Sequence, residues 1–317
     1  MWRQITKPNI GMLAGLDHIY CELQKQRPAI FPDFSDDSII FAASDYSGQH
    51  KNASYEAYSF VLTTRKRWQS WERHRLQIRS RFLLRRRISF KSLEDKRRWE
   101  VLPVFMAAAA LLDGITFTIL VNKKLGSLFS PTGKLDLNHP DLARLPNWKA
   151  SGIERMLRVT HMMALFIAGL SNEGQSLIWI TDEDDIAANE DRLREVTTIF
   201  SEVSSSLLEH NLRHFRFGTT ASDNGTMQLE DLAAIADLSA GALVDVLTDL
   251  ESDSKITTPH LFLPIGHNVS RKSRAVMTWF TSYGMPMRHV IIALDPGAMG
   301  EINLRRMVFD EISRDAV

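Results

Sequence analysis

Acidic side chains at three separate places in the sequence could act together on one substrate. Asp45 and the group Asp182–Asp185 each follow a short apolar run that is typical of a buried strand. Glu230, Asp231 and Asp237 lie in an apolar pattern of helical period. Carboxylates at strand ends and on one helix face attract hard divalent cations, which prefer oxygen ligands. A two-metal site of this kind would suit the hydrolysis of phosphodiesters.

The first two acidic groups also have simpler structural interpretations. Asp45 stands at a strand end, where turns favour aspartate. If strand geometry continues, Asp182 and Asp184 point to one face, and the four adjacent acids repel one another without a cation. A helix is expected to start at Asn189, and its dipole favours acids near its N-terminus. That effect explains Asp185 better than Asp182, which lies seven residues before the helix. The sequence therefore predicts that Asp182 or Asp184 is a metal ligand.

The third acidic group lies on a predicted helix. Glu230 and Asp237 are two helical turns apart and share one stripe, whereas Asp231 points roughly a third of a turn away. Asp237 stands among alanine, glycine and leucine residues, where an unpaired charge is unfavourable. A metal ion, a buried arginine or a raised pKa would each neutralise it.

Positive charge is concentrated in one segment of a chain whose formal net charge is zero. Residues 65–98 contain 14 Lys and Arg against 3 acids, a net of +11, so the remainder carries −11. Such a segment is typical of a protein that binds a phosphate backbone, although a solvated arginine-rich helix would look the same. The residues expected to contact nucleic acid are Arg65, Lys66, Arg67, Arg85, Arg86, Arg87 and Lys91.

Composition excludes several classes of protein. A chain of 317 residues, 44% hydrophobic and 24% charged, can bury a large core and is not broadly disordered. The single cysteine, Cys21, excludes a disulfide framework, and the first eight residues lack the apolar core of a secretory signal, so we expect a cytoplasmic protein. The apolar stretch Val101–Leu120 is interrupted by Pro103 and by Asp113 and Gly114, which predicts a buried helix and strand and no membrane partner.

Other catalytic and cofactor motifs are missing from the sequence. It contains no glycine-rich dinucleotide or phosphate-binding loop and no Gly-x-Ser-x-Gly motif. Of its histidines, His210 and His214 have ligand-like spacing, but they straddle an expected helix end and strand start. The carboxylates therefore remain the best candidates for chemistry.

The order of predicted elements indicates an α/β sandwich with a mixed sheet flanked by helices. We expect a single domain over residues 1–317, with a core at about 39–250 and a helix and strand extension at about 251–317. Within that extension, residues 256–264, 271–283 and 289–294 have the apolar patterns of strands and a helix. The core strands are expected at 39–43, 55–63, 115–122, 177–181 and 212–219, and the helices at 65–84, 95–112, 152–170, 189–210 and 230–250.

Three short motifs resemble the domain-of-unknown-function family numbered 3800. They are the strand end Asp45-Tyr46-Ser47-Gly48, the strand Trp179-Ile180-Thr181-Asp182 and the helix 230–243, and the resemblance spans about residues 39–250. It implies a ribonuclease-H-like fold, with strand-borne and helix-borne acids around magnesium or manganese. This chain departs from the family at Tyr46, where a glutamate is usual, and in the several acids at 182–185, where one would suffice.

Our leading hypothesis is a metal-dependent nuclease that hydrolyses phosphodiesters of DNA or RNA. Asp45, Asp182 and Asp237 would be the catalytic acids, and Asp184 and Glu230 would be further ligands of Mg²⁺ or Mn²⁺. A second hypothesis is a non-catalytic nucleic-acid-binding or regulatory module on the same fold. A third is an interaction protein whose acids and arginines pair with each other.

Overall fold

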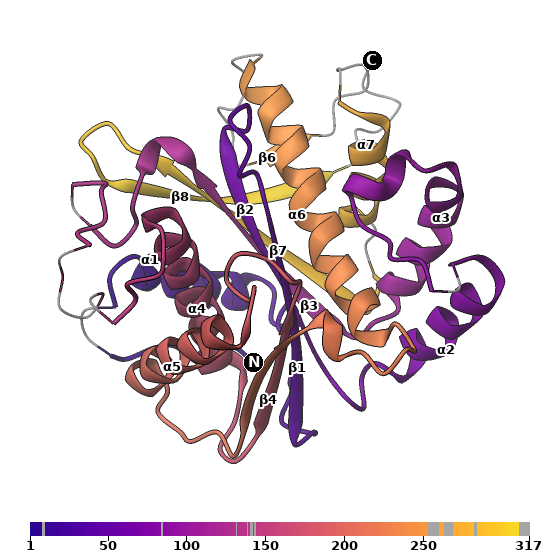
Figure 1. The fold of residues 1–317 in the computed structure, drawn as a ribbon, viewed down its shortest axis with the longest axis horizontal. Coiled ribbons are helices and arrows are strands. Elements are labelled where there is room, and N and C mark those ends of the chain that lie inside the picture. The colour runs from indigo at the N-terminus through magenta and orange to yellow at the C-terminus, as the bar shows by residue number, and fades with distance from the viewer. Residues whose placement is uncertain are drawn as a thin grey trace. The chain divides into compact units, whose positions relative to one another are not determined.

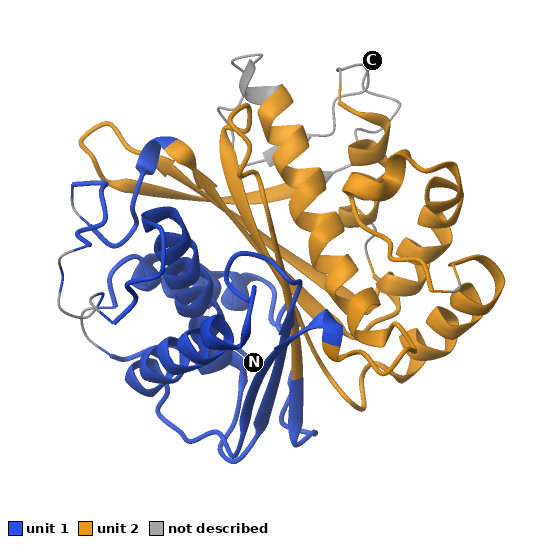
Figure 2. Ribbon diagram, in the orientation of Figure 1, with its two compact units in different colours: residues 1–40, 124–221 blue, residues 41–123, 222–317 orange. Residues whose placement is uncertain are grey.

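The fold is an α/β arrangement in which a mixed sheet is flanked by helices, as the sequence predicts. Its contacts divide the chain into two compact units: unit 1 contains residues 1–40 and 124–221, and unit 2 contains residues 41–123 and 222–317 (Figure 2). The expectation of a single domain stays a prediction, and each unit is described by itself. The computed structural model describes residues 1–7, 10–83, 85–130, 132–137, 139, 142, 144–252, 260–262, 269–281 and 284–310.

Unit 1 contains a parallel pair of strands joined by a helix. Strand β4 (Ser176–Thr181) pairs with β5 (Phe215–Thr219), and α5 (Glu190–Leu207) connects them (Figure 1). The long helix α4 (Ala150–Leu170) packs against α5 and is buried along most of its length, as its apolar sequence requires. Helix α1 (Met12–Gln26) completes the unit. Because β4 ends at Thr181, the acids that follow it lie at the carboxyl end of a parallel strand, where α/β proteins commonly bind ligands.

Unit 2 contains a larger sheet of mixed direction. Strand β2 is antiparallel to β3, β3 is parallel to β7, β7 is antiparallel to β8, and β6 is parallel to β8. Every residue of β3 is buried, which explains why its sequence is apolar without alternation. The strands lie in the order β1 (Ile39–Ser47, in this unit from Phe41), β2 (Tyr55–Thr64), β3 (Gly114–Asn122), β7 (Met287–Pro296), β8 (Ile302–Asp310) and β6 (His260–Phe262).

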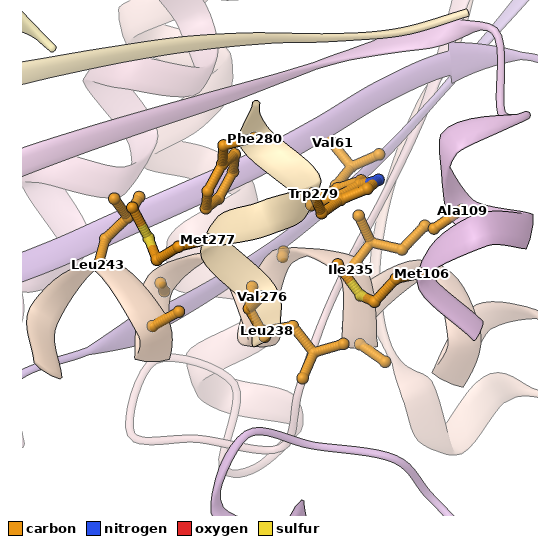
Figure 3. Close-up of a cluster of buried hydrophobic side chains, with 14 of the residues drawn as sticks. Val61, Met106, Ala109, Ile235, Leu238, Leu243, Val276, Met277, Trp279 and Phe280 are labelled. Carbon is orange, nitrogen blue, oxygen red and sulfur yellow. The ribbon is translucent and has the colours of Figure 1, made fainter. Parts of the chain in front are cut away.

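The helices of unit 2 share one apolar core with its sheet. Side chains from β2, α3, α6 and α7 meet there, including Val61, Met106, Ile235 and Trp279 (Figure 3). Helix α6 contacts β2 closely because alanine and glycine recur along it. The helices are α2 (Gln69–Ile78), which continues into a π-helical turn (Arg79–Leu83), a 3₁₀ turn (Lys91–Glu94), α3 (Lys96–Ala110), α6 (Gln228–Ser252) and α7 (Arg271–Phe280).

Most predicted elements are confirmed, with three corrections. The helix expected at 65–84 is shorter, because α2 covers Gln69–Ile78 and a π-helical turn follows at Arg79–Leu83. Strand β1 continues through Ser47, so Asp45 lies inside a strand and not in a turn; the strand ends at Gly48, whose φ of 91° suits glycine. Helix α1 was not predicted, because it begins after Gly11 without a side-chain cap or an acid in its first turn. Of the expected segment 256–264, the structure describes residues 260–262; its other residues, and the end of the segment 271–283, lie outside the described ranges.

The apolar stretch Val101–Leu120 contains the end of α3 and most of β3, so it forms a buried helix and strand as expected. Among the helices of the described residues, none has both the length and the apolar content that crossing a membrane requires.

Candidate carboxylate site

Asp45 lies in unit 2, half-buried, on the face of the sheet that α6 covers. Side chains alternate along β1, so Asp45 shares its face with Phe41 and Ala43. Ala43 belongs to the core cluster that contains the buried side chains of α6, and Phe41 packs against that cluster. Asp45 therefore points into the same layer, between sheet and helix, from which α6 approaches.

Asp237 lies on α6 and is also half-buried, between the buried residues Ala236 and Leu238. Its carboxylate accepts a hydrogen bond from the backbone N–H of Phe90. The ring of Phe90 lies against Gly241, one turn further along α6, where any side chain would collide with it. The sequence led us to expect a fully packed charge at Asp237, but the carboxylate is partly exposed and has a backbone donor as one partner.

The fully buried acid of this helix is Asp231, which has 0% of its surface exposed. Its carboxylate forms ion pairs with two arginines of the α2 segment: it lies 3.1 Å from Nη1 of Arg75 and 2.8 Å from Nε of Arg79. Burial raises the pKa of Asp231, and the two guanidinium groups oppose that rise. Asp231 thus joins α6 to α2 and is not available to a substrate.

Glu230, a predicted metal ligand, forms an ion pair with Arg87, a predicted nucleic-acid contact. The distance from Glu230 Oε2 to Arg87 Nε is 2.5 Å, and 14% of the Glu230 side chain is exposed against 48% of the Arg87 side chain. The arginine neutralises the carboxylate, which makes Glu230 the least suitable of the predicted ligands.

In unit 1, the acids after β4 alternate in exposure as expected, although they lie in a loop. Asp182 and Asp184 are half-buried, whereas Glu183 and Asp185 are exposed. Asp182 Oδ1 accepts hydrogen bonds from the backbone N–H of Glu183, at 2.8 Å, and from the hydroxyl of Thr220, at 3.3 Å. Thr220 directly follows β5, so Asp182 spans the ends of both parallel strands.

The next two acids of this loop differ sharply from each other. Burial raises the pKa of Asp184 to about 6, although its Oδ1 accepts the backbone N–H of Ile186 at 2.9 Å. Asp185 is exposed and forms an ion pair of 3.0 Å with Arg155. A bound cation would favour the ionised form of Asp184 and so offset the effect of burial. Of Asp184 and Asp185, Asp184 is therefore the better candidate for a metal ligand.

The basic segment contains buried and exposed cations with different roles. Arg75 and Arg79 are buried against Asp231, and Arg67 is half-buried in an ion pair of 2.6 Å with Asp113. Asp113 also binds Arg288 of β7, at 2.8 Å, so Arg67 and Arg288 meet at the carboxylate that precedes β3. The predicted nucleic-acid contacts that are exposed are Arg65, Lys66, Arg85, Arg86, Arg87 and Lys91.

The predicted ligands have the oxygen donors that a divalent cation needs, but the described residues do not form a cluster around one point. Among the described residues, no three His, Cys, Asp or Glu side chains form a group that could hold a metal ion. Four of the predicted ligands are nevertheless half-buried aspartates, which offer the oxygen donors that Mg²⁺ and Mn²⁺ prefer: Asp45, Asp182, Asp184 and Asp237.

Sequence analysis gave too little weight to Asp231 and its two arginines. One signal was present: Arg75 occupies a position of the apolar stripe formed by Trp71 and Ile78. A cation at a core position predicts a buried acid as its partner. The partner is far away in sequence, so its identity required the fold.

Comparison with known proteins gives weak structural similarity and no match in sequence. No family model matches the chain, and no curated protein sequence matches it. Among solved structures, the chain is similar to the one described as the "Crystal structure of the ribonuclease H2 from Pyrococcus horikoshii OT3", with 9% sequence identity and a TM-score of 0.34 over 77% of this chain and 86% of that one. A similarity at this level supports no argument about activity, and the resemblance to family 3800 stays a prediction.

Proposed function

We propose that this protein is a metal-dependent hydrolase of nucleic-acid phosphodiesters. The observation that carries the proposal is the placement of Asp45 and Asp237 in unit 2. Both aspartates are half-buried, one on the sheet face that α6 covers and the other on α6 itself. Buried Asp231, by contrast, is held by arginines. That Asp182 or Asp184 also binds a cation stays a prediction from the sequence.

Each group of residues would have a distinct task in the reaction. Mg²⁺ or Mn²⁺, when bound, would lower the pKa of an attacking water and neutralise charge on the phosphate. Asp45 and Asp237 would hold the cation. Lys91 is exposed and directly follows Phe90, whose N–H binds Asp237, so its ammonium group can reach a phosphate beside the carboxylates. Arg85 and Arg86, also exposed, would hold the neighbouring backbone without reading its bases.

The test is cleavage of DNA and RNA, single- and double-stranded, with Mn²⁺ and with EDTA. We expect metal-dependent cleavage that falls by about 100-fold or more in Asp45→Asn and in Asp237→Asn, because each loses a charged metal ligand. Glu230→Gln is the matched control, since Arg87 already neutralises that carboxylate. Equal rates in all four proteins, or cleavage that persists in EDTA, would reject the site.

A non-catalytic nucleic-acid-binding module is the second candidate. It is favoured by Tyr46, which stands where the family usually has glutamate. The Tyr46 side chain is buried, and its hydroxyl lies 2.8 Å from that of Ser44. Alternation places Tyr46 on the opposite face of β1 from Asp45, and its phenol offers no carboxylate to a cation. Salt-sensitive binding without metal-dependent turnover would support this second candidate.

A further inference from the structure

Unit 2 contains a cavity of about 470 Å³ that none of the predicted acids line. Its walls come from the segment around the start of α3 and from the start of α7, and they include the basic side chains Lys96, Arg271 and Lys272 and the ring of Trp99. These cations come from chain segments about 175 residues apart, so the fold and not local sequence brings them together. Lys272 and Arg271 lie outside the basic segment that the sequence singled out.

Aromatic rings hold two of these cations at the cavity wall. The guanidinium of Arg271 lies 4.4 Å from the centroid of the Trp99 ring, and Nζ of Lys272 lies 4.5 Å from that of Phe90. Cation–π contacts of this kind fix the position of a charge while leaving it positive. The planar Arg271 group, supported by Trp99, is also a surface on which a nucleic-acid base can stack.

The residues that line the cavity include three cations and one acid. Glu94 also lines the wall, and its Oε1 lies 3.8 Å from Nζ of Lys272, but 83% of the Glu94 side chain is exposed, so solvent weakens this pair. Asp245 accepts hydrogen bonds from the hydroxyls of Ser270 and Ser273, at the start of α7. Lys96 adds a third cation at the rim; its Nζ lies 4.0 Å from Oε1 of Glu100, and both side chains are exposed, so solvent weakens this pair too.

Phe90 connects this cavity to the candidate carboxylate site. Its backbone N–H donates to Asp237, while its ring lies under Nζ of Lys272. The two features therefore lie on either side of a single residue. A polynucleotide whose scissile phosphate is at Asp237 could place an adjacent nucleotide in the cavity, which is larger than a phosphate group requires.

We propose that this cavity binds a nucleotide of a single-stranded polynucleotide next to the cleavage point, with its phosphate at Lys96 and Lys272 and its base on the Arg271–Trp99 pair. The proposal rests on the proposed function, whose substrate class it narrows. It predicts that the protein prefers strands that extend past the scissile bond over dinucleotides.

The test compares two triple variants that remove equal charge. One is Lys96→Ala/Arg271→Ala/Lys272→Ala in the cavity; the other is Lys149→Ala/Arg213→Ala/Arg216→Ala, exposed residues of unit 1. Affinity for fluorescent single-stranded oligonucleotides is measured by anisotropy in EDTA, so that no cleavage occurs. We expect the cavity variant to bind about 10-fold or more weakly, with a smaller salt dependence, and the control to bind within about twofold of the parent.

Further measurements separate folding, stacking and catalysis. Thermal melting checks that the cavity variant is folded, and Arg271→Lys keeps the charge while losing the planar surface, so it should lose oligonucleotide affinity with a near-parental melting temperature. Equal loss in both triple variants, or none in the cavity variant, overturns the cavity proposal even if Mn²⁺-dependent cleavage is found. Selective loss in the cavity variant, in a protein that never cleaves, upholds the binding site and rejects the proposed hydrolase.

Discussion

Two aspartates of α6, six residues apart, have different surroundings. Asp231 is fully buried between Arg75 and Arg79, whereas Asp237 is half-buried and bound by a backbone N–H. Arg75 also pairs with Glu72, at 2.7 Å, so the loss of Asp231 would leave Arg79 as the buried cation without a carboxylate partner. The partly exposed carboxylate can instead change partners when a substrate or ion arrives.

The first prediction concerns the stability of this buried network. Asp231→Asn should lower the free energy of unfolding by about 3–5 kcal/mol, because Arg79 loses its countercharge in the core and Arg75 keeps only Glu72. Urea denaturation followed by circular dichroism measures the change. In the control, Glu230→Gln, the half-exposed Arg87 can turn to solvent, and the loss should stay below about 1 kcal/mol. Equal losses in the two variants would contradict the assignment.

A second prediction concerns the pH dependence of stability at His289. Its ring lies 4.3 Å from that of Trp279 and 5.0 Å from that of Phe280, and burial lowers its pKa from 6.5 to about 3. Between these values the unfolded chain binds a proton that the folded protein excludes. Stability is therefore complete above the unfolded pKa and falls as pH drops below it, by about 1.4 kcal/mol per pH unit.

The measurement compares the parent with His289→Gln by urea denaturation from about pH 7 to about pH 5. Groups that titrate in both proteins cancel in the difference. The variant should be less stable at neutral pH, because the packing and the 2.6 Å contact with the Thr116 hydroxyl change, but its stability should fall less on acidification. Parallel pH profiles would show that His289 is protonated normally in the folded protein.

The residue scale also shows where sequence analysis reaches its limit. Asp182 and Asp184 were expected to share one face, and both are the less exposed members of their group. The sequence favoured Asp237 as the buried acid, which is wrong, because burial of Asp231 depends on Arg79, which is 152 residues away. Periodicity identifies the face of a helix that is buried but not which distant side chain meets it.

At the scale of elements, α6 is the centre of unit 2, since it covers β2 and contacts α7. Its sequence of alanines and glycine lets neighbouring segments approach closely, most clearly where Gly241 meets the ring of Phe90. That contact holds the chain segment whose N–H binds Asp237. The small residues of α6 therefore position a candidate functional carboxylate as well as packing the core.

A third prediction tests this close approach. Gly241→Ala should destabilise the protein by about 1–3 kcal/mol, because the added methyl group collides with Phe90 in a filled core. In a Phe90→Ala background the same change should be stabilising by up to about 1 kcal/mol, since alanine favours a helix over glycine. A double-mutant cycle by urea denaturation measures the reversal. The same sign in both backgrounds would mean that Phe90 does not limit the space at Gly241.

Helices and strands were predictable where they are buried along their whole length or where a capping residue marks the end of a helix. The apolar runs of β3 and α4 are nearly continuous, and Asp95 caps α3 by accepting the backbone N–H of Arg98 at 3.1 Å. Helix α1 has neither signal, so it was missed. The expected helix 65–84 is shorter as an α-helix, because the chain passes into a π-helical turn at Arg79, which no local propensity distinguishes.

In the molecule as a whole, the positively charged residues have two roles. The basic segment, net +11, includes arginines that hold the interior of unit 2 together, such as Arg75 and Arg79, and exposed ones that remain available to a polyanion. A count of charges from sequence therefore overestimates the number of phosphate contacts. The net charge of zero for the whole chain also means that attraction to nucleic acid must be local.

A fourth prediction follows for binding to nucleic acid in different salt concentrations. Arg85→Ala/Arg86→Ala should reduce the slope of log affinity against log salt concentration by about one to two, because each exposed arginine contacts at most one phosphate. Arg75→Ala should instead lower the free energy of unfolding, by about 3–5 kcal/mol. Anisotropy titrations and urea denaturation give the two quantities. A salt slope that is unchanged in the double variant would remove these arginines from the interface.

Unit 2 is assembled from two stretches of chain that are interrupted by most of unit 1. On the ribosome, the strands and helices of its first stretch emerge long before α6, so Arg79 must wait for Asp231, and the apolar faces of β2 and α3 wait for their cover. A nascent chain that has reached only Ala221 would hold an open hydrophobic surface beside an arginine whose carboxylate partner is not yet made. Translation pauses and chaperones that act in that interval would then govern the yield of this protein more than its final stability does.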